Sequence, residues 1–198
     1  MIRLPNDYDN ARGFDGNALP QLTPGGHICR IQGARVEQSR KGKDMLVIAF
    51  DIAEGGEFDG YFKERYDRSA KYDVNAKWPG IFRTTILNSE GGTNGYFKGF
   101  IEAVEASNNG YNFKATGGDE QTLKGKCVGF NFGEEEYENR YGEIKTSVKP
   151  AYAISVAKVR EGVAPPAKKL LDATKRYAQS GGQGDAGGFT DYNEELPF

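Results

Sequence analysis

The stretch MLVIAFDIA at residues 45–53 constrains the fold more than any other part of the chain. In an extended strand, Leu46 and Phe50 fall on one face, and Val47 and Ala49 fall on the other. A strand that is apolar on both faces is covered on both sides. The sequence therefore predicts a central β-strand at this position, with other parts of the chain packed above and below it.

Four further segments have the alternating, β-branched character of strands, at residues 27–37, 58–66, 122–135 and 144–159. Residues 93–110 instead repeat their apolar side chains at helical spacing. The resulting order is strand, strand, strand, helix, strand, strand. This order is typical of the OB-fold, a five-stranded Greek-key barrel with its helix between strands 3 and 4. We therefore predict a mainly β fold of this kind.

Composition predicts how the chain is divided around this barrel. The 27 glycines and the 12% aromatic content favour a sheet-rich fold with open turns. Residues 1–25 are expected to form an irregular arm, and residues 26–162 the OB-fold nucleic-acid-binding domain. Residues 163–180 could add a short helix, and residues 181–198 are expected to form a flexible Gly-rich linker with an acidic tip.

The charges are distributed unevenly along the chain. Residues 181–198 contain four of the 28 acidic side chains and none of the 26 basic ones, which leaves 26 basic and 24 acidic side chains before them. A slightly basic body is compatible with a polyanionic partner but does not require one. No stretch approaches the ~18 apolar residues that span a membrane, and no signal-peptide core is visible. We expect a cytoplasmic protein with no membrane partner.

The sequence offers little for catalysis. His27 is the only histidine, and together with Cys29 and Cys127 it does not give the paired spacing of a zinc site. The sequence contains no P-loop, the phosphate-binding motif that ends in Gly-Lys-Ser/Thr. The acidic stretch GEEEYE at residues 133–138 could hold magnesium, which keeps a metal-dependent nuclease as a minor alternative. We predict a non-enzymatic protein with no metal and no cofactor.

Aromatic and basic residues alternate in three clusters, at residues 61–72, 77–83 and 137–145. Single-stranded nucleic acid is bound in this way, because cations follow the phosphates while flat rings stack on the bases. In OB-folds the ligand crosses strands 2 and 3, between the loops here predicted at residues 39–44 and 135–143. The predicted nucleic-acid-binding residues are Arg40, Lys41, Lys43, Tyr61, Lys63, Arg65, Tyr66, Lys77, Trp78, Arg83, Tyr137, Arg140, Tyr141 and Lys145.

Some rings are expected in the core instead. Buried phenylalanine is ordinary, so Phe62, Phe82, Phe130 and Phe132 are predicted to fill the barrel. Tyrosine and tryptophan beside cations remain the better candidates for stacking on bases.

The stretches GGHICRIQGARVEQSRKGKDMLVIAFDIAEGGEFDGYF, YFKGFIEAVEASN and LKGKCVGFNF resemble a phage protein family encoded near recombination and replication genes. The similarity covers roughly residues 24–160. It lies in a Gly-led first strand, a Lys/Arg-Gly-Lys hairpin, an apolar second strand and a Gly-Glu-x-x-Gly turn. The resemblance implies an OB-fold and a single-stranded DNA-binding protein.

The ending DYNEELPF resembles the acidic tip of bacterial and phage single-stranded DNA-binding proteins. In that family the tip docks into basic pockets of replication, recombination and repair proteins. A terminal Phe side chain suits an apolar slot, and its carboxylate suits a basic residue. Here Leu196 stands where isoleucine is more usual, and the acidic run is sparse. The predicted partner-binding residues are Glu194, Glu195, Leu196, Pro197 and Phe198.

Two functions therefore compete. The first is a protein that coats single-stranded DNA, largely without sequence preference, during phage replication or recombination, and that recruits partner proteins through its tip. The second is a non-catalytic adaptor in which the OB barrel is a scaffold for the tail. A homo-oligomer is compatible with the sequence, which leaves open the oligomeric state, the binding-site size and the preference for DNA or RNA.

Overall fold

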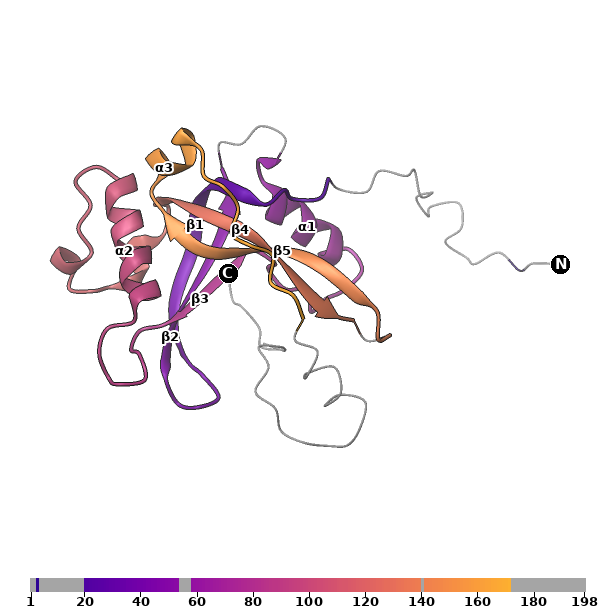
Figure 1. Cartoon of the computed structure of the whole chain (residues 1–198), viewed down its shortest axis with the longest axis horizontal. Coiled ribbons are helices and arrows are strands. Elements are labelled where there is room, and N and C mark those ends of the chain that lie inside the picture. Colours follow the sequence, from indigo (N-terminus) through magenta and orange to yellow (C-terminus); the bar gives the residue numbers. More distant parts are fainter. Residues whose placement is uncertain (1–2, 4–19, 54–57, 140, 172–198) are drawn as a thin grey trace.

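The computed structural model describes residue 3 and residues 20–53, 58–139 and 141–171. Five antiparallel strands form one sheet in the order β3-β2-β1-β4-β5 (Figure 1). The strands are β1 (Gly25–Gln38), β2 (Asp44–Ile52), β3 (Ile81–Thr85), β4 (Cys127–Glu138) and β5 (Ile144–Ile154). Among the described strands, β3 and β5 form no ladder with each other. The fold is mainly β as predicted, but its sheet is open and the expected closed barrel is not observed.

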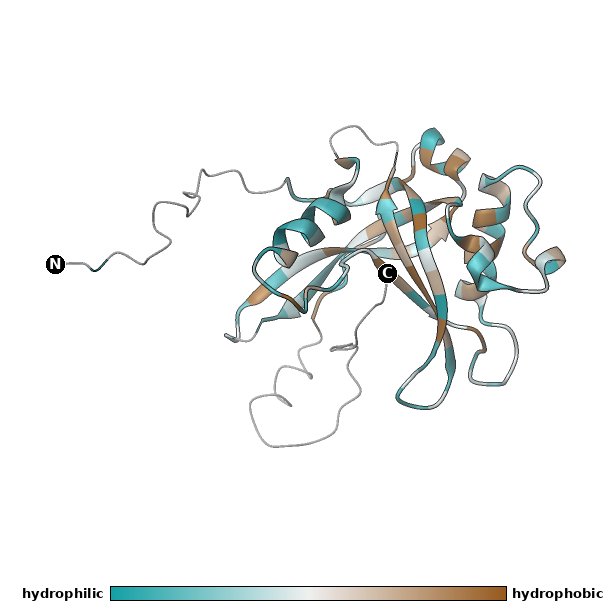
Figure 2. Cartoon of the chain, turned by 180° about the vertical axis from the view of Figure 1, so that it is seen from behind, coloured by the Kyte–Doolittle hydropathy of each residue, from teal (hydrophilic) through white to brown (hydrophobic). Residues whose placement is uncertain are grey.

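Three helices accompany the sheet: α1 (Tyr61–Ala70), α2 (Gly95–Ser107) and α3 (Val156–Glu161). Two short 3-10 turns, η2 (Lys114–Thr116) and η3 (Glu120–Leu123), precede β4. Figure 2 shows that α1 is mostly hydrophilic, whereas α2 carries more hydrophobic residues. None of the helices in the described ranges is both long enough and apolar enough to span a membrane.

The strand predicted over residues 58–66 is wrong, because these residues enter helix α1. The carboxylate of Asp51, in β2, accepts hydrogen bonds from the backbone N–H groups of Phe62 at 2.9 Å and Lys63 at 3.2 Å. These N–H groups belong to the first turn of a helix, where no partner exists within the helix itself. Asp51 therefore stabilises a helix start that the local sequence does not show. The third strand is instead β3, a five-residue segment further along the chain.

Other predicted elements differ mainly at their ends. The strands predicted at 27–37 and 45–53 correspond to β1 and β2, and the helix predicted at 93–110 corresponds to α2. The strand predicted at 144–159 ends at Ile154, where the side chain of Ser155 caps α3. The strand predicted at 122–135 starts later, at Cys127, because η3 occupies the preceding residues.

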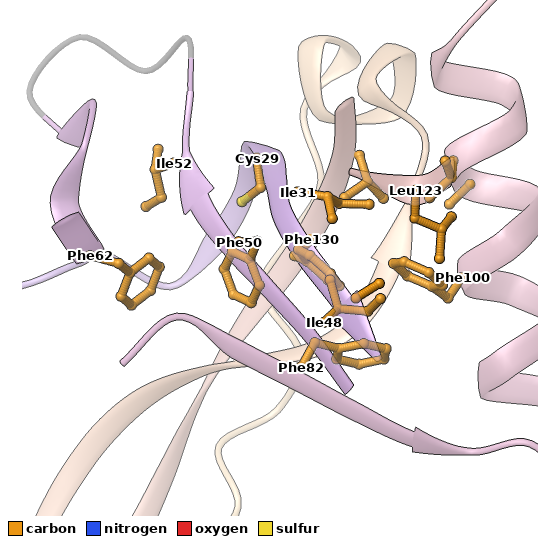
Figure 3. Packing of buried hydrophobic residues seen from close by; sticks show 14 of the residues in the cluster. Cys29, Ile31, Ile48, Phe50, Ile52, Phe62, Phe82, Phe100, Leu123 and Phe130 are labelled. Carbon is orange, nitrogen blue, oxygen red and sulfur yellow. The ribbon is translucent and has the colours of Figure 1, made fainter. Parts of the chain in front are cut away.

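β2 is buried on both faces, and one of them, with Leu46, Ile48, Phe50 and Ile52, belongs to the main core cluster. Every residue from Met45 to Ile52 is buried, which confirms the prediction for this strand. Figure 3 shows Phe50, Phe82 and Phe130 pointing toward one another, and the ring centroids of Phe50 and Phe130 are 4.7 Å apart. Phe100 of α2 closes one end of this cluster. The prediction that Phe62, Phe82, Phe130 and Phe132 fill the core is confirmed.

The segment after α3, residues 163–171, lies against β4 and is here called the strap. Pro166 packs so closely on Gly133 that a Cβ atom there would lie 2.7 Å from its ring. Lys169 forms a parallel bridge with β4: its N–H donates to the carbonyl of Glu134, and its carbonyl accepts from the N–H of Glu136, both at 2.9 Å. The described part of the helix expected over 163–180 is therefore extended rather than helical; residues 172–180 lie outside the described residues.

Candidate nucleic-acid interface

A groove of about 850 Å³ runs along β3 and separates it from the β4–β5 hairpin and the strap. One side, here called the β3 wall, consists of residues 77–79 and 81–85, from β3 and its approach, together with Asn94 and Tyr96. The opposite side, here called the hairpin wall, consists of residues 133–135, 148–151 and part of the strap. Because β3 is at one edge of the sheet and β5 at the other, the two edges of the open sheet face each other across this groove.

Trp78 lies at the start of the β3 wall and is held in place by β2. Its indole Nε1–H donates a hydrogen bond to the carbonyl oxygen of Phe50 at 3.0 Å. The ring of Tyr66, from α1, packs against the Trp78 ring at a tilt, with a centroid separation of 5.6 Å. Trp78 is half-buried and lines the groove, so it can support the fold and present part of its ring to a ligand.

Gly80 allows this close approach of the chain to β2. A Cβ atom at Gly80 would lie 2.3 Å from the carbonyl oxygen of Phe50 and 2.8 Å from the ring of Phe62. The carbonyl of Gly80 accepts a hydrogen bond from the N–H of Phe50 at 2.9 Å. Any side chain at position 80 would push the β3 wall, including Trp78, away from the sheet.

Tyr96 lies at the other end of the β3 wall and was not predicted as a binding residue. Asn94 caps α2 by accepting a hydrogen bond from the N–H of Tyr96, and its amide donates to the Thr85 hydroxyl, both at 2.8 Å. The Tyr96 side chain is 63% exposed. The sequence could have indicated this exposure, because Tyr96 lies outside the apolar stripe that runs through Phe97 and Phe100 on the same helix.

The structure brings three of the predicted binding residues, Lys77, Trp78 and Arg83, together in the groove. The others that the structure describes lie outside it. The loop of the β1–β2 hairpin holds Arg40, Lys41 and Lys43, which are exposed, and the β4–β5 hairpin holds Tyr137, Tyr141 and Lys145. Figure 1 shows these two hairpins extending from the body in different directions. Arg140 and the tip residues 194–198 lie outside the described residues.

The prediction for Tyr61 is corrected by its burial. Its side chain is only 6% exposed, and its hydroxyl accepts a hydrogen bond from the N–H of Leu22 at 3.3 Å. The ring packs edge-on against Phe62, so it is not available to stack on a base. On the exposed side of α1, Lys63 pairs with Asp67 at 2.5 Å, and the Arg65 guanidinium lies 4.8 Å from the centre of the Tyr61 ring.

Charge is divided unequally between the two walls. The β3 wall contains Lys77 and Arg83 and, among its described residues, no acidic side chain. The hairpin wall contains two basic and two acidic side chains, which are Lys149, Lys169, Glu134 and Glu135. Lys149 pairs with Glu135 at 3.3 Å. The groove therefore has a basic side and a side of balanced charge.

Two ionisable groups near the core have raised pKa values. Burial raises the pKa of the Cys29 thiol well above its ordinary value, as expected for a cysteine that acts as a small apolar core residue. Burial also raises the pKa of Asp51, although three backbone N–H groups oppose this shift. The described residues hold no group of three or more His, Cys, Asp or Glu that could bind a metal ion. Within the acidic stretch at 133–138, Glu136 pairs with Lys168.

Comparison with known proteins does not assign the chain to a family. No protein-family model matches the chain, and no curated protein matches it at a significant level. The function must therefore be inferred from the groove and from the chemistry of the side chains that line it.

Proposed function

We propose that this chain is a phage-type single-stranded DNA-binding protein that holds the strand in the groove along β3. The observation that carries the proposal is the β3 wall, which combines Lys77 and Arg83 with the ring of Trp78 at one end and that of Tyr96 at the other. Cations neutralise the phosphates while aromatic rings stack on the bases, in a manner that tolerates any sequence. The protein binds and protects the strand during replication or recombination without catalysing a reaction.

An OB-fold underlies this proposal. The order β3-β2-β1-β4-β5 is what an OB barrel gives when it is opened between its third and fifth strands. Helix α2 follows β3 and precedes β4, as the helix of an OB-fold does. The groove then occupies the gap between the two open edges, next to the second and third strands where OB-folds hold their ligands.

The groove favours a single strand over a duplex. Stacking on Trp78 or Tyr96 needs a base with a free face, and bases inside a duplex have both faces covered by their neighbours. The β3 wall is also short: five strand residues span about 17 Å at roughly 3.3 Å per residue. This length suits a few unstacked nucleotides, at the lower end of the roughly 4–16 that one OB-fold binds.

Titration of the intrinsic fluorescence of Trp78, the only tryptophan, with a thymidine oligonucleotide tests the proposal. Binding should change the emission, and the logarithm of the affinity should fall linearly with the logarithm of salt concentration, by about 0.7 per neutralised phosphate. Affinity for a duplex of the same length should be much weaker. Binding that is independent of salt, or equal binding to the duplex, would contradict the proposal. Retained partner binding with no DNA binding would favour the adaptor.

The tip extends the proposal to protein partners. The described chain ends beside the hairpin wall, where the N–H of Leu171 donates a hydrogen bond to the Glu136 carboxylate at 3.2 Å. From there the sequence continues through glycine-rich residues to Glu194–Phe198. We infer that the tip binds basic pockets of replication or recombination proteins, through its acids and its terminal Phe carboxylate.

Deleting residues 194–198 tests the role of the tip. Thermal stability should stay nearly unchanged, because these residues follow a glycine-rich segment. DNA affinity should stay the same or rise slightly at low salt, where a lost negative segment matters most. Pull-downs with intact and truncated protein should differ in the replication or recombination proteins recovered. Recovery of the same partners by both would rule out a docking role for the tip.

A further inference from the structure

The two walls of the groove differ in charge. Phosphates are attracted to Lys77 and Arg83 on the β3 wall. The hairpin wall offers no such excess of positive charge, and it includes apolar side chains such as Val148, Pro150 and Pro166. A strand with its phosphates against the β3 wall would therefore turn at least some of its bases toward the hairpin wall.

One acidic side chain on the hairpin wall, Glu134, differs from its neighbours. Glu135 pairs with Lys149 at 3.3 Å, and Glu136 pairs with Lys168 at 3.1 Å. The carboxylate of Glu134 forms no hydrogen bond or ion pair with any residue in the part of the chain that the structure describes. Only its backbone is engaged, because its carbonyl accepts the hydrogen bond from Lys169.

The position of Glu134 directs this carboxylate into the groove. Glu134 is half-buried, and it is directly opposite Val148 in the β4–β5 ladder. Directly opposite residues of an antiparallel pair have their side chains on the same face of the sheet. Val148 packs against the core, and both residues line the groove. A carboxylate without a partner thus lies where a ligand would pass.

Such a carboxylate is unfavourable next to a phosphate, because like charges repel more strongly in a partly buried site than in water. It is favourable next to a group that donates hydrogen bonds, since an ionised carboxylate only accepts them. The bases differ in this respect. Cytosine and adenine carry an exocyclic amino group, and guanine presents a ring N–H and an amino group side by side. The single ring N–H of thymine lies between two carbonyl oxygens, which repel a carboxylate that approaches it.

We propose that Glu134 reads the bases of the bound strand, by accepting hydrogen bonds from guanine, cytosine or adenine and disfavouring thymine. This inference rests on the proposed binding of single-stranded DNA in the groove and adds a base preference to it. The side chains that bind phosphates and stack on bases would give affinity for any sequence, while Glu134 would adjust it at the one position that the carboxylate reaches.

The test compares three eight-nucleotide strands, dT8, dC8 and d(TG)4, on the full-length protein and on Glu134→Gln; about eight nucleotides lie within the range for one OB-fold. The wild-type protein should bind dC8 and d(TG)4 about tenfold more tightly than dT8. This is the affinity ratio that the net free energy of one charge-assisted hydrogen bond would give. In Glu134→Gln the affinity for dT8 should rise, because glutamine can also donate to thymine oxygens. The ratio of the dC8 or d(TG)4 affinity to the dT8 affinity should then fall toward one.

A matched control separates this effect from a change in net charge. Glu161→Gln removes the same charge from α3, at an exposed position outside the groove, and should keep the wild-type ratio. Glu134→Asp keeps the charge but withdraws the carboxylate, and should lower the ratio without raising dT8 affinity as far as glutamine does. Thermal unfolding of each variant confirms that it is folded.

The outcomes are distinct. Equal wild-type affinity for the three strands, or a preference that survives in Glu134→Gln, overturns the role of Glu134 while leaving single-strand binding intact. Failure of the wild-type protein to bind any of the strands overturns the proposed function itself, and the base preference with it.

Discussion

Residues 61–72 and residues 77–83 both alternate aromatic and basic side chains, but only the second stretch brings its cations to the groove. From the first stretch, only the buried ring of Phe62 borders the groove. The first forms α1, which turns Tyr61 and Phe62 into the core and leaves its cations on an outer helical surface, one of them paired with Asp67. The second runs along the edge of β2, where Trp78 and Lys77 face the gap in the open sheet. The composition of such a cluster is therefore not enough to define a binding surface; the position of its backbone relative to the sheet decides which side chains a ligand can reach.

The largest effect is expected from Gly80→Ala, a substitution that tests whether the position of the second stretch depends on Gly80. In Gly80→Ala the added Cβ would collide with the carbonyl oxygen of Phe50, so the stretch must shift. We expect a loss of roughly 1–3 kcal/mol in the free energy of unfolding, as in other overpacked sites, together with weaker DNA binding. Urea denaturation and oligonucleotide titration measure the two effects.

Gly99→Ala is the matched control for this substitution. Gly99 lies inside α2, and a Cβ there would meet nothing within 4 Å. Alanine should stabilise the helix by about 0.5–1 kcal/mol and leave DNA binding unchanged. Equal stability of Gly80→Ala and the wild-type protein would show that the contact with β2 does not fix the β3 wall.

The contrast between the two stretches also shows what the sequence could and could not predict. β2 was predictable because its apolar run is short for a helix and contains the β-branched residues Val47 and Ile48, which favours a strand buried on both faces. The aromatic residues at 58–66 fit either a strand or one side of a helix. The group that decides between them, the carboxylate of Asp51, comes from another element and is brought to α1 only by the fold.

The groove was predictable only in part, for a similar reason. Lys77, Trp78 and Arg83 are close in sequence, so their common location follows from a short extended segment. Glu134 belongs to an acidic run that reads as a solvated hairpin, and nothing in that run separates it from Glu135. The ion pair that Lys149 makes with Glu135, but not with Glu134, depends on the register of β4 and β5.

The second prediction concerns stacking at the far end of the β3 wall. Tyr96→Ala should weaken single-strand binding by about 1–3 kcal/mol, the value of one stacked base, and leave the fold intact because the side chain is largely exposed. Tyr72→Ala is the control: Tyr72 follows α1, is 88% exposed and does not line the groove. Titrations of both variants with the same oligonucleotide give the comparison. Equal losses of DNA affinity in the two variants would contradict binding in the groove, because Tyr72 lies outside it.

The smallest expected effect compares one cation from each stretch. Lys77→Gln should lower DNA affinity modestly and reduce the slope of log affinity against log salt by about 0.7, the change for one phosphate contact on a single strand. Lys63→Gln should leave the slope unchanged, because Lys63 lies on α1 outside the groove and is already paired with Asp67. Affinities measured over a series of salt concentrations give both slopes. A reduced slope in Lys63→Gln would show that the binding surface extends onto α1. Both stretches would then bind the same strand, because a strand that leaves the groove past Trp78 and Tyr66 would reach the cations of the helix.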